Sequence, residues 1–488
     1  MVDAAASPLT LGVDLGTSAV KVLALGADGT VVASGACEFA TVSELPGQAE
    51  QDPADWIAAL GHACVALDRN LAGHVPDWRD RVEAIGLAGQ LPTLVCLGAK
   101  GPLGPAITWK DARTDTWALA TIDAAERRAL YERTGMPIDG RYLGPMFRCH
   151  GLDRNSAVES VFSAKDYLCY VLTGERLTDP STAAGYAAFD LETQHFSTEL
   201  AQRWLLPASA LPSVHPAHAL AGPLNAIGAR LLGVRPGIAV TVGAADSVAS
   251  AYAMAGLTEG VACVTMGSST VIIDAVRERR LDPRTRYLLT SHVEPGWYGR
   301  EMDLLATGTG YRWLSGLFDW PDGALDQRAA ESRAGARGLS FAPYLAGGEQ
   351  GALWDPTLRG TLRGLTLEHA ASDIARAFLE GVCFEIRRCL DVLAETATLH
   401  EIVVAGHIVE RPSTLQLLAS IVRVPVRPFA AVSPAALGAA LGALKLVAPS
   451  RPLPAPASNA SGQVIAPGPD RDRYEALYHQ YVATNRSD

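Results

Sequence analysis

Short hydrophobic runs separated by glycine-containing turns fill the N-terminal segment and predict a β-meander. The runs cover residues 9–14, 20–25 and 31–36, and Ala27-Asp28-Gly29-Thr30 between the last two is a hairpin signal. Proline at position 53 then opens a helical pattern, because proline suits the first turn of a helix. Strand-like and helical patterns continue to alternate, so the sequence favours an α/β fold.

A similar pattern returns in the second half of the chain. Residues 261–266 and 270–274 read as strands, and Gly267-Ser268-Ser269 forms the polar turn between them. Strand–turn–strand units of this kind at both ends of the chain indicate a duplicated architecture. We therefore expect two domains, residues 1–255 and 256–488.

The C-terminal part continues with a strand over residues 402–405 and helices over about 413–422 and 435–443. Residues 451–469 are rich in proline, alanine and serine and predict an extended linker. The last helical pattern repeats aromatic residues on one face, which predicts core packing and not a binding site. This stripe consists of Tyr474, Leu477, Tyr478 and Tyr481.

Composition and charge narrow the classes of partner. Of the 488 residues, 48% are hydrophobic, which is enough apolar material for large cores. The formal net charge is −11, and because an acidic chain lacks the counterion release that drives nucleic-acid binding, we expect no nucleic-acid partner. We expect neither a signal peptide nor a membrane span, because the first residues lack a basic region and a long apolar run, and no apolar stretch approaches the ~18 residues that a span needs. With eight scattered cysteines, these features predict a cytoplasmic protein with no membrane association.

The first candidate for chemistry is the turn after the first strand. Gly16 lets backbone amides approach an anion closely, and Thr17 and Ser18 add hydroxyl donors. Asp14 at the strand end can hold Mg²⁺, directly or through water. The same pattern also fits an ordinary hairpin with a polar turn, in which Lys21 is a solvated residue of the strand face.

A second candidate lies at Gly243-Ala-Ala-Asp246, where an apolar strand ends and a helix begins. Aspartate at this place is commonly a helix N-cap. Alternatively, Asp246 is a general base that takes a proton from a hydroxyl group during phosphoryl transfer.

Further blocks follow in the order and spacing of the FGGY carbohydrate kinase family. The chain resembles this family over nearly its whole length, and the xylulokinases most. The opening Asp14-Leu-Gly-Thr-Ser-Ala-Val-Lys21 is similar to the family's first phosphate hairpin, and Gly243-Ala-Ala-Asp246 is similar to its catalytic-aspartate block. Other similar blocks are Gly86–Gln90, Pro105–Arg113, Ala164–Leu168, Asp179–Gly185, Pro343–Gly347, Trp354–Gly360, Ala377–Val382 and Ala436–Leu441.

The resemblance implies two actin-like, ribonuclease H-like α/β domains flanking a deep cleft, with sugar bound mainly by the first and MgATP by the second. Asp246 would be the catalytic base, and Asp14 would serve the metal and the phosphates. The implied nucleotide-site residues are Gly16, Thr17, Ser18, Lys21, Gly267, Ser268, Ser269, Thr307, Gly308, Thr309, Gly406 and His407. The implied sugar-site residues are Gln90, Leu91, Pro92, Trp109, Asp111 and Arg113.

Two segments depart from the family pattern. The sugar strand usually reads Gly-Gln-Met-His-Gly, but here Pro92 replaces the histidine that would bind a sugar hydroxyl. We therefore expect a related ketose, polyol or deoxysugar as acceptor, unless neighbouring residues supply the contact that lets D-xylulose bind. In the glycine-rich turn under the adenosine, His407 and Ile408 replace glycines, so we expect another loop path, with weaker ATP binding or a changed nucleotide donor.

The resemblance thus implies a kinase that uses ATP and Mg²⁺ to phosphorylate a sugar or polyol, and it suggests a homodimer. The alternative is a non-catalytic or weakly active sugar-binding or regulatory protein on the same fold. Retention of Asp14, Lys21 and Asp246 argues against that alternative, because a pure binder needs no base. An actin-like or chaperone-type ATPase is disfavoured by the sugar-site blocks.

Overall fold

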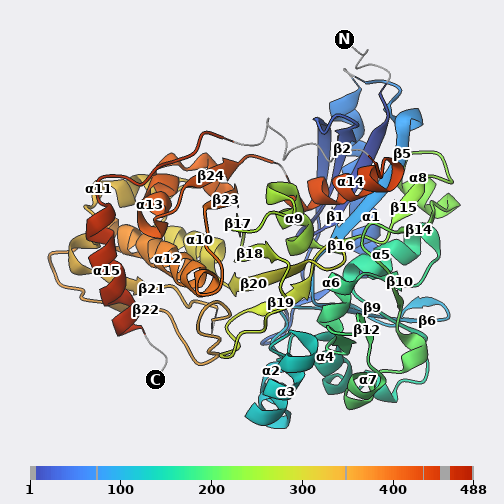
Figure 1. The fold of residues 1–488 in the computed structure, drawn as a ribbon, viewed down its shortest axis with the longest axis horizontal. Helices are drawn as coiled ribbons and strands as arrows, with labels where there is room; N and C mark the ends of the chain where they lie inside the picture. The colour runs from blue at the N-terminus through green and yellow to red at the C-terminus, as the bar shows by residue number, and fades with distance from the viewer. Residues whose placement is uncertain (1–6, 73–74, 347–348, 432, 451–461, 486–488) are drawn as a thin grey trace.

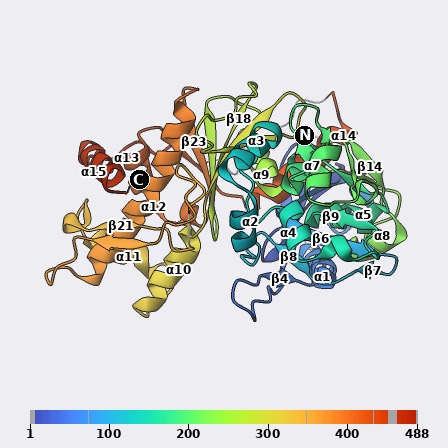
Figure 2. The ribbon, with the colours of Figure 1, turned by 90° about the horizontal axis from the view of Figure 1, so that it is seen from below.

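Two β-sheets, one from each half of the chain, form the centres of two lobes (Figure 1). The computed structural model describes residues 7–72, 75–346, 349–431, 433–450 and 462–485. The first lobe lies on the right of Figure 1 and the second on the left, and Figure 2 shows them side by side from below.

The first sheet begins with the predicted meander. Its strand order is β14-β15-β5-β1-β2-β3, with β16 beside β5; β1, β2 and β3 pair antiparallel, and β1 is parallel to β5. All residues of β1 are buried, as expected for an apolar strand covered on both faces. The strands are β1 Leu9–Leu15, β2 Ala19–Gly26, β3 Val31–Glu38, β5 Val82–Gly89, β14 Leu220–Pro223, β15 Ala239–Thr241 and β16 Ala244–Ala245.

Helices and smaller sheets complete the first half of the chain. The helices are α1 Pro53–Leu71, α2 Asp115–Thr121, α3 Ala124–Thr134, α4 Leu143–Cys149, α5 Ala164–Thr173, α6 Pro180–Ala183, α7 Thr198–Arg203, α8 Ala226–Leu232 and α9 Asp246–Ala255. The smaller sheets comprise β4 Glu50–Gln51, β6 Thr93–Gly98, β7 Gly101–Pro102, β8 Ala106–Thr108 and β9 Ser160–Phe162, together with the pairs β10 Leu177–Thr178/β13 Ser213–Val214 and β11 Phe189–Asp190/β12 His195–Phe196.

The second sheet has the order β19-β20-β18-β17-β23-β24, and its β17–β18 hairpin matches the strands predicted around Gly267–Ser269. The strands are β17 Val261–Met266, β18 Thr270–Val276, β19 Leu288–Ser291, β20 Tyr298–Leu304, β23 Glu401–Gly406 and β24 Val426–Phe429, with β21 Ser340–Ala342 and β22 Thr361–Arg363 forming a separate pair. The helices of this half are α10 Thr307–Leu317, α11 Ala324–Glu331, α12 Ala371–Ala394, α13 Pro412–Val422, α14 Pro434–Val447 and α15 Arg471–Thr484.

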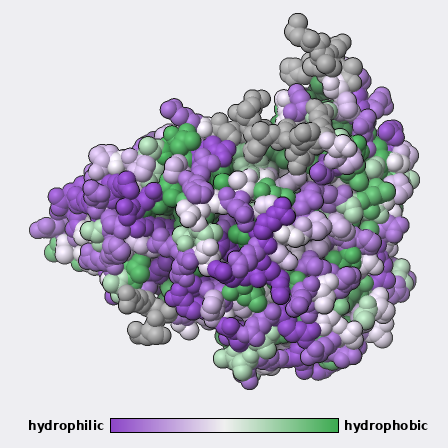
Figure 3. All heavy atoms as spheres, viewed as in Figure 1, coloured by the Kyte–Doolittle hydropathy of each residue, from purple (hydrophilic) through white to green (hydrophobic). Residues whose placement is uncertain are grey.

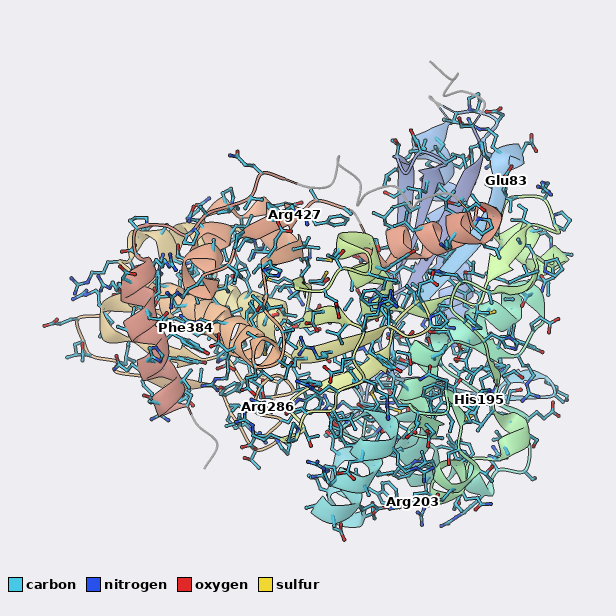
Figure 4. All side chains as sticks on the ribbon, viewed as in Figure 1. Glu83, His195, Arg203, Arg286, Phe384 and Arg427 are labelled. Atoms are coloured by element: carbon cyan, nitrogen blue, oxygen red, sulfur yellow. The ribbon has the colours of Figure 1, made fainter. Side chains whose placement is uncertain are left out.

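The aromatic stripe of α15 packs into the core of the second lobe. Tyr474, Tyr478 and Tyr481 are buried, and their rings lie 5.1 to 6.4 Å from the ring of Phe384 on α12 (Figure 4). The prediction of core packing is therefore confirmed. Of the predicted linker 451–469, residues 451–461 lie outside the described residues.

Helix α14 comes from the end of the chain but packs on the first sheet (Figure 1). The contact is backbone against backbone, because a Cβ on Gly12 of β1 would lie 1.8 Å from the carbonyl oxygen of Ala436. On the helix itself, a Cβ on Gly438 would lie 1.9 Å from the carbonyl oxygen of Ala249 in α9. Glycine on both surfaces thus lets the last long segment of the chain close over the first strands.

Hydrophilic residues cover most of the face seen in Figure 3, and hydrophobic ones form small scattered groups there. The apolar residues of the sequence are concentrated in the cores around the two sheets. Within the described residues, no helix combines the length and apolar character needed to cross a membrane.

Candidate active site

Side chains from both lobes line a partly open cavity of about 160 Å³ between them. Asp246 and Thr17 come from the first lobe, and Ser269 comes from the β17–β18 turn of the second. The polar side chains of the lining are Thr17, Trp109, Arg141, Tyr142, Ser181, Asp246, Ser247, Ser269, Thr290, Glu301, Asp303 and Gln350. The arrangement brings a carboxylate of one lobe to the same small space as a polar turn of the other.

A tight turn before α9 positions Asp246. Gly243 has φ +87°, and a Cβ there would lie 2.4 Å from the carbonyl oxygen of Leu87, so glycine is required. The N-cap of α9 is Ala245, and Asp246 occupies the first helical position, where its carboxylate accepts a hydrogen bond from the amide of Ser247 at 2.8 Å. Asp246 is therefore not the N-cap of this helix.

The electrostatics around Asp246 favour a proton acceptor near neutral pH. Burial, followed by the negative charge of nearby Asp14, raises the pKa of Asp246 to about 7. The amide of Ser247 and the ammonium group of Lys21 oppose this shift. A general base is most effective when its pKa lies close to the working pH, and Asp246 meets that condition.

Asp14 lies at the end of β1, opposite Lys21 of β2. Its Oδ2 accepts a hydrogen bond from the hydroxyl of Ser433, the N-cap of α14, at 3.0 Å. Its Oδ1 is buried and has no hydrogen-bond partner among the described residues, and burial raises the pKa of the carboxyl. An unsatisfied buried carboxylate oxygen fits a hard cation such as Mg²⁺, either bound directly or through water.

The turn after β1 is held by its neighbours. Gly16 donates its amide to the carbonyl oxygen of Ala19 at 3.1 Å, which closes the turn. The indole of Trp109 donates to the hydroxyl of Thr17 at 3.2 Å, so Trp109 joins this turn to the segment that follows β8. Ser18 is exposed beside them.

The second polar turn, Gly267-Ser268-Ser269, is bonded to the start of α10. A Cβ on Gly308 would lie 2.1 Å from the carbonyl oxygen of Gly267, so the two segments touch through their backbones. Thr309 donates its amide to the carbonyl oxygen of Ser268 at 3.0 Å, and the hydroxyl of Thr307 bonds that of Thr270 at 2.8 Å. The resulting cradle combines a glycine turn with a helix N-terminus, an arrangement suited to binding phosphate.

A second cavity, of about 460 Å³, opens on the other side of this cradle. Gly267, Thr307 and Gly308 form one wall of this cavity, and His407 and Ile408 belong to another. The remaining lining residues are Met266, Tyr311, Arg312, Ser315, Gly316, Trp320, Asp322, Phe378, Leu379, Val382, Arg411 and Thr414. The mixture of apolar side chains at one end and a phosphate-type cradle at the other suits a nucleotide.

The loop after β23 takes a path that avoids strain at the replaced glycines. Gly406 has φ +94°, and a Cβ there would lie 2.1 Å from the carbonyl oxygen of Met266. His407 and Ile408 keep negative φ because residues His407–Glu410 form a turn of 3₁₀-helix before α13. Ile408 is buried in the core of the lobe, and His407 is exposed at the cavity.

The predicted sugar-side residues fall into two groups. Leu91, Pro92 and Trp109 line the 160 Å³ cavity. Gln90 lies behind it, fully buried, and donates its side-chain amide to the side-chain oxygen of Gln51 at 2.8 Å.

Asp111 and Arg113 form a structural ion pair that fixes the loop after β8. The Arg113 guanidinium bonds Asp111 at 2.6 Å and also pairs with Glu50, while Asp111 accepts the amide of Ala49 at 2.9 Å. Asp111 borders a wider cleft of about 1020 Å³ outside the cavity, and Arg113 lines neither of these spaces.

Three charged residues of the cavity were not predicted from the sequence. Glu301 and Asp303 alternate along β20 and face the cavity, and Arg141 stands opposite on the first lobe, paired with Asp139. The hydroxyl of Ser247 donates to Glu301 at 2.9 Å across the lobes. Burial raises the pKa of Asp303 to about 6 and that of Glu301 well above its ordinary value.

Residues 9–253 match the N-terminal domain of the FGGY family of carbohydrate kinases, and residues 262–446 match its C-terminal domain. The chain belongs to this family. The kinase is 30% identical to the xylulose kinase of Escherichia coli (strain K12) over 396 residues, which is 78% of each chain.

Two further relatives widen the comparison. The kinase is 29% identical to the glycerol kinase of Gloeobacter violaceus, covering 90% of this chain and 88% of the relative. The crystal structure of a xylulose kinase from Rhodospirillum rubrum superposes with a TM-score of 0.85 at 30% identity and covers 98% of both chains. The predicted fold class, the resemblance to xylulose kinases and the assignment as a carbohydrate kinase are therefore confirmed.

Proposed function

We propose that this kinase uses ATP and Mg²⁺ to phosphorylate a hydroxyl group of a neutral ketose, polyol or deoxysugar, with Asp246 as the general base. One observation carries the proposal: Asp246 and Ser269 line the same small cavity, while Gly267 of the same turn lines the neighbouring cavity of about 460 Å³. A donor whose base occupies the larger cavity can therefore extend its phosphates over the turn toward the acceptor.

In the proposed reaction, a carboxylate oxygen of Asp246 takes the proton of the acceptor hydroxyl. At the same time the oxygen of that hydroxyl bonds to the γ-phosphorus of ATP, and the bond from this phosphorus to the bridging oxygen breaks and releases ADP. Asp14 would hold Mg²⁺, which when bound neutralises phosphate charge. The two polar turns orient the phosphates, and an acceptor that fills the small cavity would exclude water from the reacting phosphate.

The cavity also supports a class of acceptor. Leu91 and Pro92 present apolar surface, which suits an acceptor carbon without a hydroxyl group. The carboxyl groups of Glu301 and Asp303 can accept hydrogen bonds from hydroxyl groups. Asp303, with a pKa of about 6, carries a negative charge at neutral pH and would repel a carboxylate, so neutral acceptors suit the cavity and sugar acids do not.

A screen of ADP release with ketoses, polyols, deoxysugars and aldonates tests the proposal. We expect release that depends on a neutral acceptor, with aldonates at least about a hundredfold poorer because like charges oppose their binding. Asp246→Asn should lower kcat by about a thousandfold and leave the acceptor Kd within a few-fold, because the carboxylate acts on the proton in the transition state.

Three results would contradict the proposal in different ways. Turnover of Asp246→Asn within a few-fold of the parent would remove the assigned base. ADP release independent of any acceptor would indicate an ATPase, and acceptor binding without ADP release would indicate a binding protein.

A further inference from the structure

Two cations beside the phosphate cradle have no role in the chemistry described above. Lys110 follows Trp109 in the first lobe, and Arg312 lies one turn into α10 of the second. Neither has a carboxylate within ion-pair distance among the residues that the structure describes, although most arginines of the chain are paired in this way.

Arg312 lies against the cradle itself. Its guanidinium donates to the hydroxyls of Ser268 and Thr309 at 3.3 and 3.4 Å, and most of its N–H groups have no acceptor among the described residues. It also lines the nucleotide-type cavity together with Gly267 and Gly308. A guanidinium in this place suits the oxygens of a phosphate group.

Lys110 approaches the same cradle from the other lobe. Its ammonium group lies 5.3 Å from the ring centre of Trp109, and that indole is fixed by the hydroxyl of Thr17. Lys110 lines the wide cleft together with Thr309, and residues of α2 in the first lobe and α10 in the second line the same cleft. Thr309, which accepts a hydrogen bond from Arg312, lines the same cleft as Lys110 and so links the two cations. Desolvation, followed by repulsion from Arg312, lowers the pKa of Lys110, in keeping with this arrangement.

We propose that Lys110 and Arg312 form a clamp between the lobes that grips the phosphates of the nucleotide donor and draws the lobes together. Without an anion, the positive charges of Lys110 and Arg312 repel each other and oppose closure of the lobes. A polyphosphate bound between them would attract both side chains and so favour closure. Donor binding would then promote closure before any acceptor arrives. This inference rests on the proposed use of a nucleotide donor.

Binding measurements on the full chain test the clamp without turnover. The variants are Lys110→Gln and Arg312→Gln, and the matched controls are Lys100→Gln in the first lobe and Arg333→Gln in the second, both exposed and outside the cavities described above. The probes are a non-hydrolysable ATP analogue with Mg²⁺, inorganic tripolyphosphate, and adenosine.

We expect each clamp variant to raise the Kd of the ATP analogue about tenfold and to weaken tripolyphosphate binding similarly, because each removes charge-assisted contacts to phosphate. Adenosine should bind all variants alike. In small-angle scattering, the analogue should contract the parent and both controls but not Lys110→Gln.

Unchanged Kd values for the analogue in both clamp variants would overturn the clamp, and so would an equal loss of adenosine affinity, which would indicate a structural role. If such variants phosphorylate acceptors like the parent, the clamp alone is wrong. If the parent neither binds the analogue nor phosphorylates any acceptor, the clamp and the proposed function both fail.

Discussion

The ionisation of Asp246 gives the proposed reaction a definite dependence on pH. The residue must be deprotonated to act as a base, and burial and Asp14 raise its pKa to about 7 in the free protein. We expect kcat/KM for the acceptor to fall about tenfold per pH unit below 7 and to level off above about 8. Steady-state rates between pH 5.5 and 8.5 measure this. A flat profile across this range would contradict the assignment, and the residual kcat/KM of Asp246→Asn should lack the acid limb.

The sequence predicts some of the candidate residues and not others, and the difference has a physical reason. Asp14 and Asp246 follow apolar strands and lie near glycines, so both can be predicted as candidate site residues from the sequence alone. Glu301 and Asp303 lie on one face of β20, and Arg300 and Met302 lie on the other. In the sequence, two acidic residues on one strand face indicate a face exposed to solvent. Only the packing of β20 toward the first lobe turns that face into a cavity wall.

At the scale of elements, the fit of α14 depends on glycine. A Cβ at position 438 would overlap the carbonyl oxygen of Ala249 at 1.9 Å, and backbone atoms cannot move aside as a side chain can. We expect Gly438→Ala to lower the free energy of unfolding by about 3 kcal/mol, measured by urea denaturation.

Gly61→Ala is the matched control, because Gly61 also lies within a helix but has open space around its Cα. Removing a helical glycine without a clash should raise the free energy of unfolding by about 0.5–1 kcal/mol. If the two variants behaved alike, the close approach of α14 and α9 would be wrong.

The predicted elements show what local patterns can and cannot specify. The strands expected at 261–266 and 270–274 correspond to β17 and β18, and the small residues expected at 435–443 lie in α14. Local periodicity predicts the helix and the closeness of its packing, but not the partner. The hydroxyl of Thr10 donates to the carbonyl oxygen of Ala440 at 3.1 Å, a contact between opposite ends of the chain that no local pattern contains.

At the scale of the whole molecule, the first lobe needs a segment from the second half of the chain. The core beneath α14 joins Leu23 and Leu25 to Leu437 and Leu441. A fragment of residues 1–255 would leave that apolar face bare, so we expect it to aggregate. The same fragment joined through a glycine–serine linker to residues 433–448 should remain monomeric in gel filtration.

The version of the joined fragment with Leu437→Asp is the control, because Leu437 is 1% exposed and a buried charge would prevent docking of the helix. A monomeric, cooperatively folded fragment 1–255 would show that α14 is dispensable for the first lobe.

The position of α14 also orders events during protein synthesis. A ribosome releases β1 among its first residues, yet the helix that covers this strand emerges only after residue 434. Throughout that interval the nascent first lobe exposes an apolar surface that the cell must shield. A premature stop codon upstream of residue 434 would therefore delete the end of the chain and also leave β1, the strand that carries Asp14, without its covering helix.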